Sequence, residues 1–242
     1  MTNTTALLQN NGSAPLKKNV QLHASEGRPH PCGATVKDNG VNFSLYSENA
    51  TKITLLIWDN PTDVWSSHVF ELDPEQNKTF NFWHIFIEGL KPGAGYAYRV
   101  DGPRDIQEGH RFNPNKVLLD PYAHGVSLSR WERGSAVGEA DNESTCLRGI
   151  VIDVDDYDWE DDTPPSIPTS DTVIYEMHVG GFTKSPSSKV KHPGTFSGLI
   201  EKIPYLKDLG ITAVELLPVF AFDDTEVLRE HDGNELKNYW GY

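Results

Sequence analysis

The chain has 242 residues and a formal net charge of −14, from 21 basic and 35 acidic residues. Nucleic-acid binding draws on a basic surface, so this charge balance argues against a nucleic-acid partner. No run of about 18 apolar residues occurs, so we expect neither a membrane span nor a membrane partner. The two cysteines, Cys32 and Cys146, lie far apart and form no C-x-x-C pattern. This arrangement favours reduced thiols in a cytoplasmic protein over a disulfide.

Residues 1–27 are rich in Thr, Asn, Gln and Ser and show little periodicity, so they are predicted to form a disordered leader. The segment lacks a basic stretch followed by an apolar core, and therefore no secretory signal is visible. A transit peptide is the alternative, but such peptides are rich in Arg, and the first arginine here is Arg28.

Residues 28–135 are predicted to form an antiparallel β-sandwich. Five segments are rich in β-branched and aromatic residues, and most of them alternate with a period of two. Turn residues separate these segments at intervals of roughly 10 to 15 residues, the pattern of a sandwich. The predicted strands are residues 41–46, 53–58, 69–72, 82–87 and 96–100.

Residues 136–171 are predicted to connect two domains and to end in a Pro-rich linker. Residues 109–123 are expected at the domain seam and residues 127–149 on the surface. An acidic run at residues 153–162 fails as a calcium loop, because Tyr157 stands where a ligand is needed and Asp158 where glycine is needed. We therefore expect no metal and no cofactor.

Residues 172–242 begin with two apolar segments, 172–179 and 211–217, separated by a helical pattern at 195–209. Strand, crossover helix and strand at this spacing predict a parallel βαβ unit. Thr195 or Ser197 is placed to cap the helix and Gly210 to end it. Pro204 is expected to bend this helix near Ile200.

Six segments of the chain together resemble isoamylase-type glycogen debranching enzymes of the α-amylase superfamily, glycoside hydrolase family 13. They are residues 109–114, 157–162, 173–179, 192–196, 209–219 and 238–242. The resemblance implies that the sandwich is an immunoglobulin-like, early-set domain akin to carbohydrate-binding module family 48. It also implies that residues 172–242 are the start of a catalytic (β/α)8 TIM barrel, truncated after its second strand.

The activity implied by this resemblance is hydrolysis of α-1,6-glucosidic branch linkages in glycogen or related α-glucans. That chemistry uses two carboxylates about 5 to 5.5 Å apart, and in this family they follow later barrel strands. A complete barrel takes about 250 residues, so we assign no catalytic residue and expect the chain to be inactive alone. The alternative is a non-catalytic glucan-binding or regulatory module.

Three aromatic residues are candidate sugar-binding residues. The resemblance implies that Tyr242, which closes the motif Trp240-Gly241-Tyr242, stacks on the sugar ring beside the cleaved bond, with Trp240 next to it. In the sandwich, Trp65 is followed by polar residues and is expected to be exposed. Trp58 and Trp83 are further candidate stacking platforms of the sandwich, but Trp83 shares its face of the strand with Ile85 and Ile87 and is expected in the core.

Overall fold

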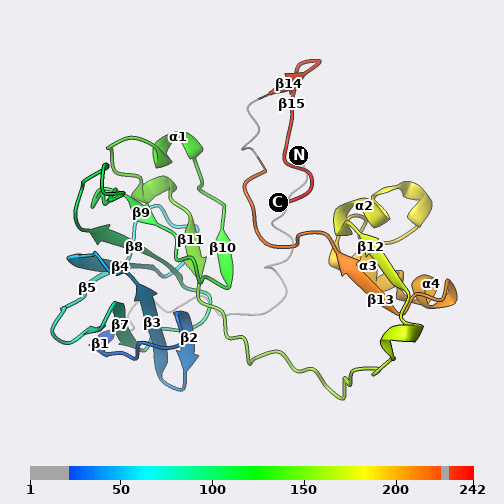
Figure 1. The fold of residues 1–242 in the computed structure, drawn as a ribbon, viewed down its shortest axis with the longest axis horizontal. Coiled ribbons are helices and arrows are strands. Elements are labelled where there is room, and N and C mark those ends of the chain that lie inside the picture. The colour runs from blue at the N-terminus through cyan, green and yellow to red at the C-terminus, as the bar shows by residue number, and fades with distance from the viewer. Residues whose placement is uncertain (1–21, 225–228) are drawn as a thin grey trace. The chain divides into compact units, whose positions relative to one another are not determined.

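A computed structural model describes residues 22–224 and 229–242. The chain divides into two compact units, Met1–Asp158 and Trp159–Tyr242 (Figure 1). The predicted leader lies outside the described residues as far as residue 21. Its last residues differ from that prediction, because His23–Glu26 form strand β1, which pairs with a strand of the first unit.

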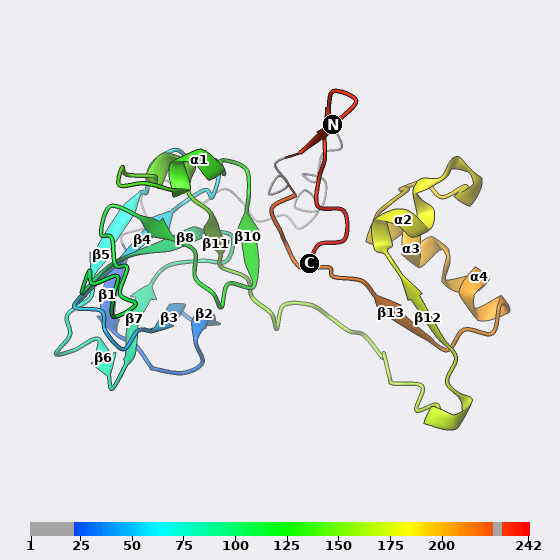
Figure 2. The ribbon, with the colours of Figure 1, turned by 45° about the horizontal axis from the view of Figure 1, so that its top comes forward.

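Two antiparallel sheets form the first unit, as predicted (Figures 1 and 2). The first sheet has the order β1-β7-β3-β2, with β6 also paired to β7; its further strands are β2 (Gly33–Lys37), β3 (Gly40–Tyr46), β6 (Lys78–Thr79) and β7 (Phe82–Glu88). The second has the order β10-β11-β8-β4-β5, with β9 also paired to β8. Its strands are β4 (Lys52–Trp58), β5 (His68–Glu71), β8 (Gly95–Asp101), β9 (Val117–Leu118), β10 (Gly125–Ser127) and β11 (Arg148–Ile150).

The core of the sandwich lies between these sheets. Phe43 of β3 and Tyr96 of β8 meet edge to face, with their ring centroids 5.0 Å apart. Trp83 of β7 is only 1 % exposed in the same cluster, and its indole N–H donates to the carbonyl of Ser47. The assignment of Trp83 to the core is therefore confirmed.

The second half of β4, Leu55–Trp58, is buried on both faces of the second sheet. Along β4, Ile53 and Ile57 enter the main core, whereas Leu56 and Trp58 join a separate cluster with Val117. This burial explains why the strand reads as a nearly continuous apolar run, because a strand covered on both sides has no solvent-facing positions. Residues 109–123, expected at a domain seam, thus contribute to the packing of the sandwich itself.

Residues 127–149 were expected on the surface and residues 136–171 outside the sandwich. Arg148 shows that both expectations are wrong. The residue belongs to β11, inside the second sheet, and is 1 % exposed. Its guanidinium lies over the ring of Trp58, 4.2 Å from the centroid. It also donates to four backbone carbonyls, those of Pro61, Asp63, Val64 and Glu143. The segment has few apolar residues, so its sequence gives no sign of this burial.

The second unit contains the parallel βαβ arrangement (Figure 2). Strands β12 (Ile174–Met177) and β13 (Ala213–Leu216) pair in parallel and are shorter than predicted. Met177 packs with Leu199 and Leu206 from the intervening helices. A complete barrel is not seen in the described residues, so the place of this pair in a barrel stays a prediction.

The remaining elements are short. They are α1 (Arg133–Ala136), α2 (Val179–Lys184), α3 (Phe196–Glu201), α4 (Ile203–Asp208), β14 (Glu230–His231) and β15 (Asn234–Glu235). None of the helices in residues 22–224 and 229–242 has the length and apolar character of a membrane span.

The predicted crossover helix is broken rather than bent. It ends at Glu201, and α4 begins with Pro204 in its first turn. Proline has no N–H to donate and its ring clashes with the preceding turn, but it is tolerated where a helix starts. Two expectations are confirmed: the Thr195 hydroxyl accepts the N–H of Gly198 at 3.1 Å, and Gly210 follows α4 with a φ of +87°.

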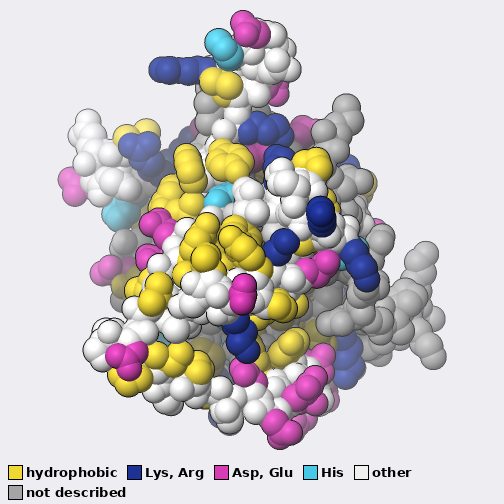
Figure 3. Space-filling model, turned by 90° about the vertical axis from the view of Figure 1, so that its right-hand side faces the viewer, with side chains coloured by type: hydrophobic (Ala, Val, Ile, Leu, Met, Phe, Trp, Pro, Cys, Tyr) yellow, Lys and Arg dark blue, Asp and Glu magenta, His cyan; other side chains and the backbone are white. Residues whose placement is uncertain are grey.

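Apolar side chains remain exposed on the second unit, and such side chains are prominent in Figure 3. Ile174, Ile200 and Val214 are among them, although Leu199 and Leu206 are buried. The apolar face of the divided helix is thus covered at Leu199 and Leu206 and open at Ile200.

We predict that Arg148→Met destabilises the sandwich by about 3 kcal/mol or more, because four buried carbonyls lose a charged donor. Urea unfolding followed by tryptophan fluorescence measures the change. Arg104→Met is the matched control, since Arg104 forms an exposed ion pair with Glu139, and such pairs contribute about 0 to 1 kcal/mol. Equal stability of the Arg148 variant and the wild type would contradict the structural role of Arg148.

Candidate functional site

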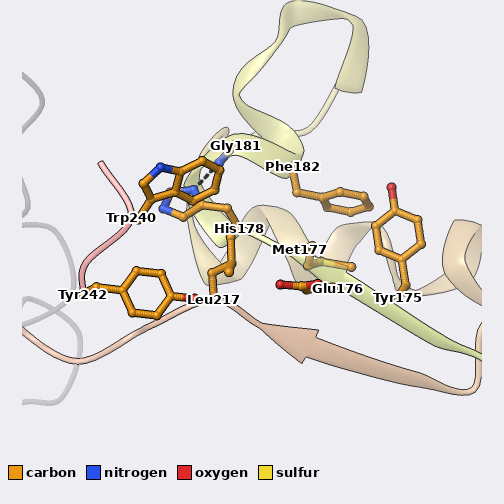
Figure 4. A pocket seen from close by; sticks show the side chains of 9 residues that line it. All are labelled: Tyr175, Glu176, Met177, His178, Gly181, Phe182, Leu217, Trp240 and Tyr242. Atoms are coloured by element: carbon orange, nitrogen blue, oxygen red, sulfur yellow. Dashed lines mark hydrogen bonds between the residues drawn. The ribbon is translucent and has the colours of Figure 1, made fainter. Parts of the chain in front are cut away.

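A pocket of about 630 Å3 lies where both parallel strands of the second unit end (Figure 4). β12 ends at Met177 and β13 at Leu216, and the pocket is lined by Met177, His178 and Leu217. Open α/β sheets and (β/α)8 barrels place their ligands at this carboxyl end of the strands. The other lining residues are Tyr175, Glu176, Gly181, Phe182, Trp240 and Tyr242.

His178 connects the end of β12 to the C-terminal motif. It precedes α2, where its Nδ1 accepts the backbone N–H of Gly181 at 2.9 Å. Its ring stacks on Tyr239, with centroids 4.5 Å apart, and meets Trp240 edge-on at 6.0 Å. No sequence pattern marks His178 as a site residue, although it lies within one of the segments that carry the resemblance.

The loop at residues 238–242 brings Trp240 and Tyr242 to the same pocket (Figure 4). The Asn238 side chain accepts the N–H of Gly241 at 3.0 Å and donates to the carbonyl of Tyr242 at 2.9 Å. Gly241 adopts a φ of +80°, which a residue with a Cβ rarely adopts. The Tyr242 side chain is 79 % exposed and leaves its ring open to a ligand.

The charge of the pocket limits its chemistry. Glu176 is the one carboxylate among the lining residues. A retaining glycosidase needs two carboxylates at the reacting bond, so these residues alone do not form such a pair. Aromatic rings predominate in the lining, and their faces suit the C–H face of a sugar.

Trp65 lies in the first unit and is not part of this pocket. Its side chain is 63 % exposed, as predicted. By contrast, Trp58 and Trp83 are buried, so neither ring can stack on a sugar. A further exposed aromatic, Phe80, was not singled out from the sequence; it adopts a φ of +53° in the turn before β7.

The turn that carries Trp65 is held from both sides. Arg148 donates to the carbonyls of Asp63 and Val64, directly before Trp65. The Glu143 carboxylate accepts the N–H of Ser66 at 3.0 Å and its hydroxyl at 2.8 Å. Because the backbone is fixed on each side of it, Trp65 is presented without a large ordering cost on binding.

Glu143 is itself held in its charged form. Burial opposes its ionisation, but the hydrogen bonds from Ser66 and from the Arg99 guanidinium, 2.8 Å away, outweigh burial and hold the pKa of Glu143 below its usual range. Arg99 also contacts Asp141 at 2.6 Å. The Trp65 turn is therefore coupled electrostatically to β8 and to residues 141–143.

Comparisons with known proteins identify the sandwich. Residues 31–123 match the family described as Carbohydrate-binding module 48 (Isoamylase N-terminal domain). Isoamylase 1, chloroplastic, of Arabidopsis thaliana is 40 % identical over 236 residues, which cover 94 % of this chain and 29 % of that protein. The glycogen debranching enzyme of Yersinia enterocolitica is 38 % identical over 228 residues, covering 90 % of this chain and 33 % of that enzyme. The chain thus spans about a third or less of these relatives.

Solved structures agree on the fold. The catalytic module of the glycogen-degrading pneumococcal virulence factor SpuA superposes with a TM-score of 0.63 at 24 % identity, over 82 % of this chain and 28 % of that one. The pullulanase SAP of Group B Streptococcus gives the same score and identity, over 82 % and 25 % of the respective chains. These structures support the fold alone, whereas the family match and the sequence relatives confirm the resemblance to isoamylase-type debranching enzymes.

We predict that Glu143→Gln lowers the free energy of unfolding of the sandwich by about 1 kcal/mol at pH 7. The variant is also expected to lose less of this free energy than the wild type when the pH is lowered. The folded-state pKa of Glu143 is depressed, so its carboxylate stabilises the fold above its usual pKa of 4.5, and this stabilisation is lost as the pH falls below that value. Urea unfolding between pH 7 and pH 3 measures both effects. Glu71→Gln, which removes an exposed carboxylate, is the control. Parallel pH profiles for wild type and Glu143→Gln would refute the prediction.

Proposed function

We propose that this chain, which carries a carbohydrate-binding module 48 domain and is homologous to isoamylases and glycogen debranching enzymes, is part of an enzyme that hydrolyses α-1,6-glucosidic branch linkages in glycogen or related α-glucans. The observation that carries the proposal is the aromatic pocket at the carboxyl ends of β12 and β13. In this proposal, residues 172–242 are the beginning of a (β/α)8 barrel, and the segment between β11 and residue 172 connects it to the sandwich.

Within the proposed enzyme, the pocket binds the sugar beside the cleaved bond. Tyr242 offers its exposed ring to one face of a glucosyl unit, and Trp240 adds a second aromatic surface. His178 holds Trp240 and Tyr239 in place through ring contacts. Binding and orientation of the glucan are thus the contributions of these residues, and we assign them no proton transfer.

The acid/base and nucleophile belong, in this proposal, to residues outside the pocket described above, because Glu176 is its single carboxylate. The 242-residue chain is therefore expected to release no reducing sugar from glycogen above background. The cytoplasmic location also stays a prediction. The competing hypothesis is a non-catalytic glucan-binding or regulatory module. It also predicts no reducing-sugar release from this chain, so a different experiment has to distinguish the two hypotheses.

We predict that the 242-residue chain co-sediments with glycogen through Trp65. Trp65→Ala is expected to reduce the bound fraction several-fold, since stacking on an aromatic ring that is already fixed contributes directly to affinity. Phe80→Ala is the control, because Phe80 is even more exposed, at 90 %, but lies in the turn of the other sheet. An equal loss in both variants, or none in Trp65→Ala, would remove Trp65 from the glucan site.

A chimera tests the catalytic context. This chain replaces the homologous third of the Yersinia debranching enzyme, and branch hydrolysis of glycogen is measured by reducing-sugar release. We expect an active chimera whose kcat/KM falls about tenfold or more on Tyr242→Ala, because a sugar contact at the reacting bond acts on the transition state. Tyr205→Ala on α4 is the control. A folded but inactive chimera would favour the non-catalytic module.

A further inference from the structure

A second cavity, of about 390 Å3, lies in the sandwich unit. Its volume falls within the range of about 300 to 1,000 Å3 that is typical of small-ligand sites. The end of β3, the strand β8 and residues 111–121 line it, and Trp65 does not. We name this cavity the β3–β8 groove.

The charged side chains of the groove are both cations. Arg111 and Lys116 are among the described residues that line it, and none of these lining residues is a carboxylate, although acidic residues outnumber basic ones by 35 to 21 in the protein. The Arg111 side chain is exposed. Lys116 is buried, and its ammonium donates to the carbonyls of Ser135 at 2.8 Å and Ala140 at 2.6 Å. An ammonium has three donors, so these two bonds leave one donor for a ligand.

The carboxylate of Glu139 lies close enough to Lys116 to interact with it, but it is held by other partners. Arg104 donates to one of its oxygens, and the side-chain amide of Asn113 donates to the other at 3.2 Å. The hydrogen bond from Arg104, with a smaller contribution from Lys116, keeps the pKa of Glu139 below its usual range. The positive charge that faces the groove is therefore not neutralised by an acidic side chain of its own lining.

A buried hydroxyl lies in the floor of the groove. Tyr98 lines the groove and is 2 % exposed, and its hydroxyl has no hydrogen-bond partner among the described residues. Buried polar groups in native proteins are nearly always paired. Burial raises the pKa of Tyr98, and the nearby carboxylate of Asp120 adds to this effect, so the phenol stays protonated and can donate to a ligand atom. The Asp120 carboxylate, which accepts from the Tyr96 hydroxyl at 2.9 Å, repels negative charge here, so the acceptor at Tyr98 has to be uncharged.

The walls between these polar groups are aromatic and aliphatic. Tyr46 is 48 % exposed, and its ring is positioned by Phe82, which it meets edge to face at 5.3 Å. Phe82 in turn meets the ring of His30 at 4.5 Å. Phe112 and Leu118 line the groove from the segment 111–121. Such walls suit a ligand with a flat apolar body.

We propose that the β3–β8 groove binds a small organic anion that has a flat apolar body and a second, uncharged oxygen acceptor. Arg111 and Lys116 bind its carboxylate or phosphate group through charge-assisted hydrogen bonds. Tyr46 packs on the body, and the Tyr98 hydroxyl donates to the uncharged oxygen. The inference goes beyond the proposed function and does not depend on it, because a ligand of this class is not a glucan.

NMR titration of the 242-residue chain with para-acetylbenzoate and with para-acetylphenyl phosphate tests the groove. Binding of either probe supports the site, and the tighter probe identifies the anionic group. We expect Arg111→Gln to weaken binding about tenfold or more, since it removes a charged donor. Lys91→Gln is the matched control, because it removes an exposed cation of the same unit that does not line the groove, and it is expected to leave the affinity unchanged.

Tyr98→Phe tests the second contact. We expect this variant to bind the two acetyl probes about three- to tenfold more weakly, because one hydrogen bond to the acetyl oxygen is lost. Its affinity for benzoate and phenyl phosphate, which lack that oxygen, is expected to stay unchanged. The variant deletes a hydroxyl that has no partner among the described residues, so its melting temperature is expected to equal or exceed that of the wild type.

Four results would overturn the inference. They are no binding of either acetyl probe, equal affinity for the uncharged acetophenone, equal weakening in Arg111→Gln and Lys91→Gln, and wild-type affinity for both acetyl probes in Tyr98→Phe. Displacement of the bound probe by maltotriose would make the groove a glucan site and overturn the assignment to an organic anion. Glycogen co-sedimentation and the chimera report on the proposed function whichever of these results is obtained.

Discussion

The burial of the Arg148 guanidinium is the interaction on which the sandwich and its presented tryptophan depend. An arginine is costly to bury unless its donors are satisfied and its plane is covered. Here four backbone carbonyls accept from its two terminal nitrogens and the face of Trp58 covers its plane, while Nε alone has no partner among the described residues. The same contacts fix the chain just before Trp65, so the stability of the second sheet and the presentation of an exposed ring have one origin.

Glu143 complements Arg148 from the other side of the turn. Its backbone carbonyl accepts from Arg148, and its carboxylate accepts from Ser66 and Arg99. Two charged side chains thus hold a polar loop that has little apolar surface of its own to bury. A platform for sugar stacking benefits from this arrangement, because rigid aromatic rings lose little entropy on binding. Residues 31–123, which contain Trp65, are those that match carbohydrate-binding module 48.

The second unit is organised around a pair of parallel strands. Its two parallel strands end at one pocket, and the loop at residues 238–242 returns to it through the stacking of Tyr239 on His178. The apolar side chains left exposed, such as Ile174 and Val214, surround a sheet of only two strands. The sandwich buries its aromatic rings between two sheets, whereas this unit gathers them at the ends of its strands.

The sequence by itself determined the five main sandwich strands, the parallel βαβ order, the cap at Thr195, the exposure of Trp65 and the place of Trp240 and Tyr242 in one motif. These features follow from local periodicity, local turn chemistry and recognisable short segments. The tertiary structure alone decided that Pro204 divides the helix in two, that Arg148 is a core residue, and that His178 supports the C-terminal aromatics. It also buried the Tyr98 hydroxyl without a partner among the described residues. The physical reason is that the burial of Arg148 and the stacking of His178 depend on partners far away in the chain. The break at Pro204 is local, since proline clashes with the turn before it, but the sequence alone did not show whether the helix would bend or break there.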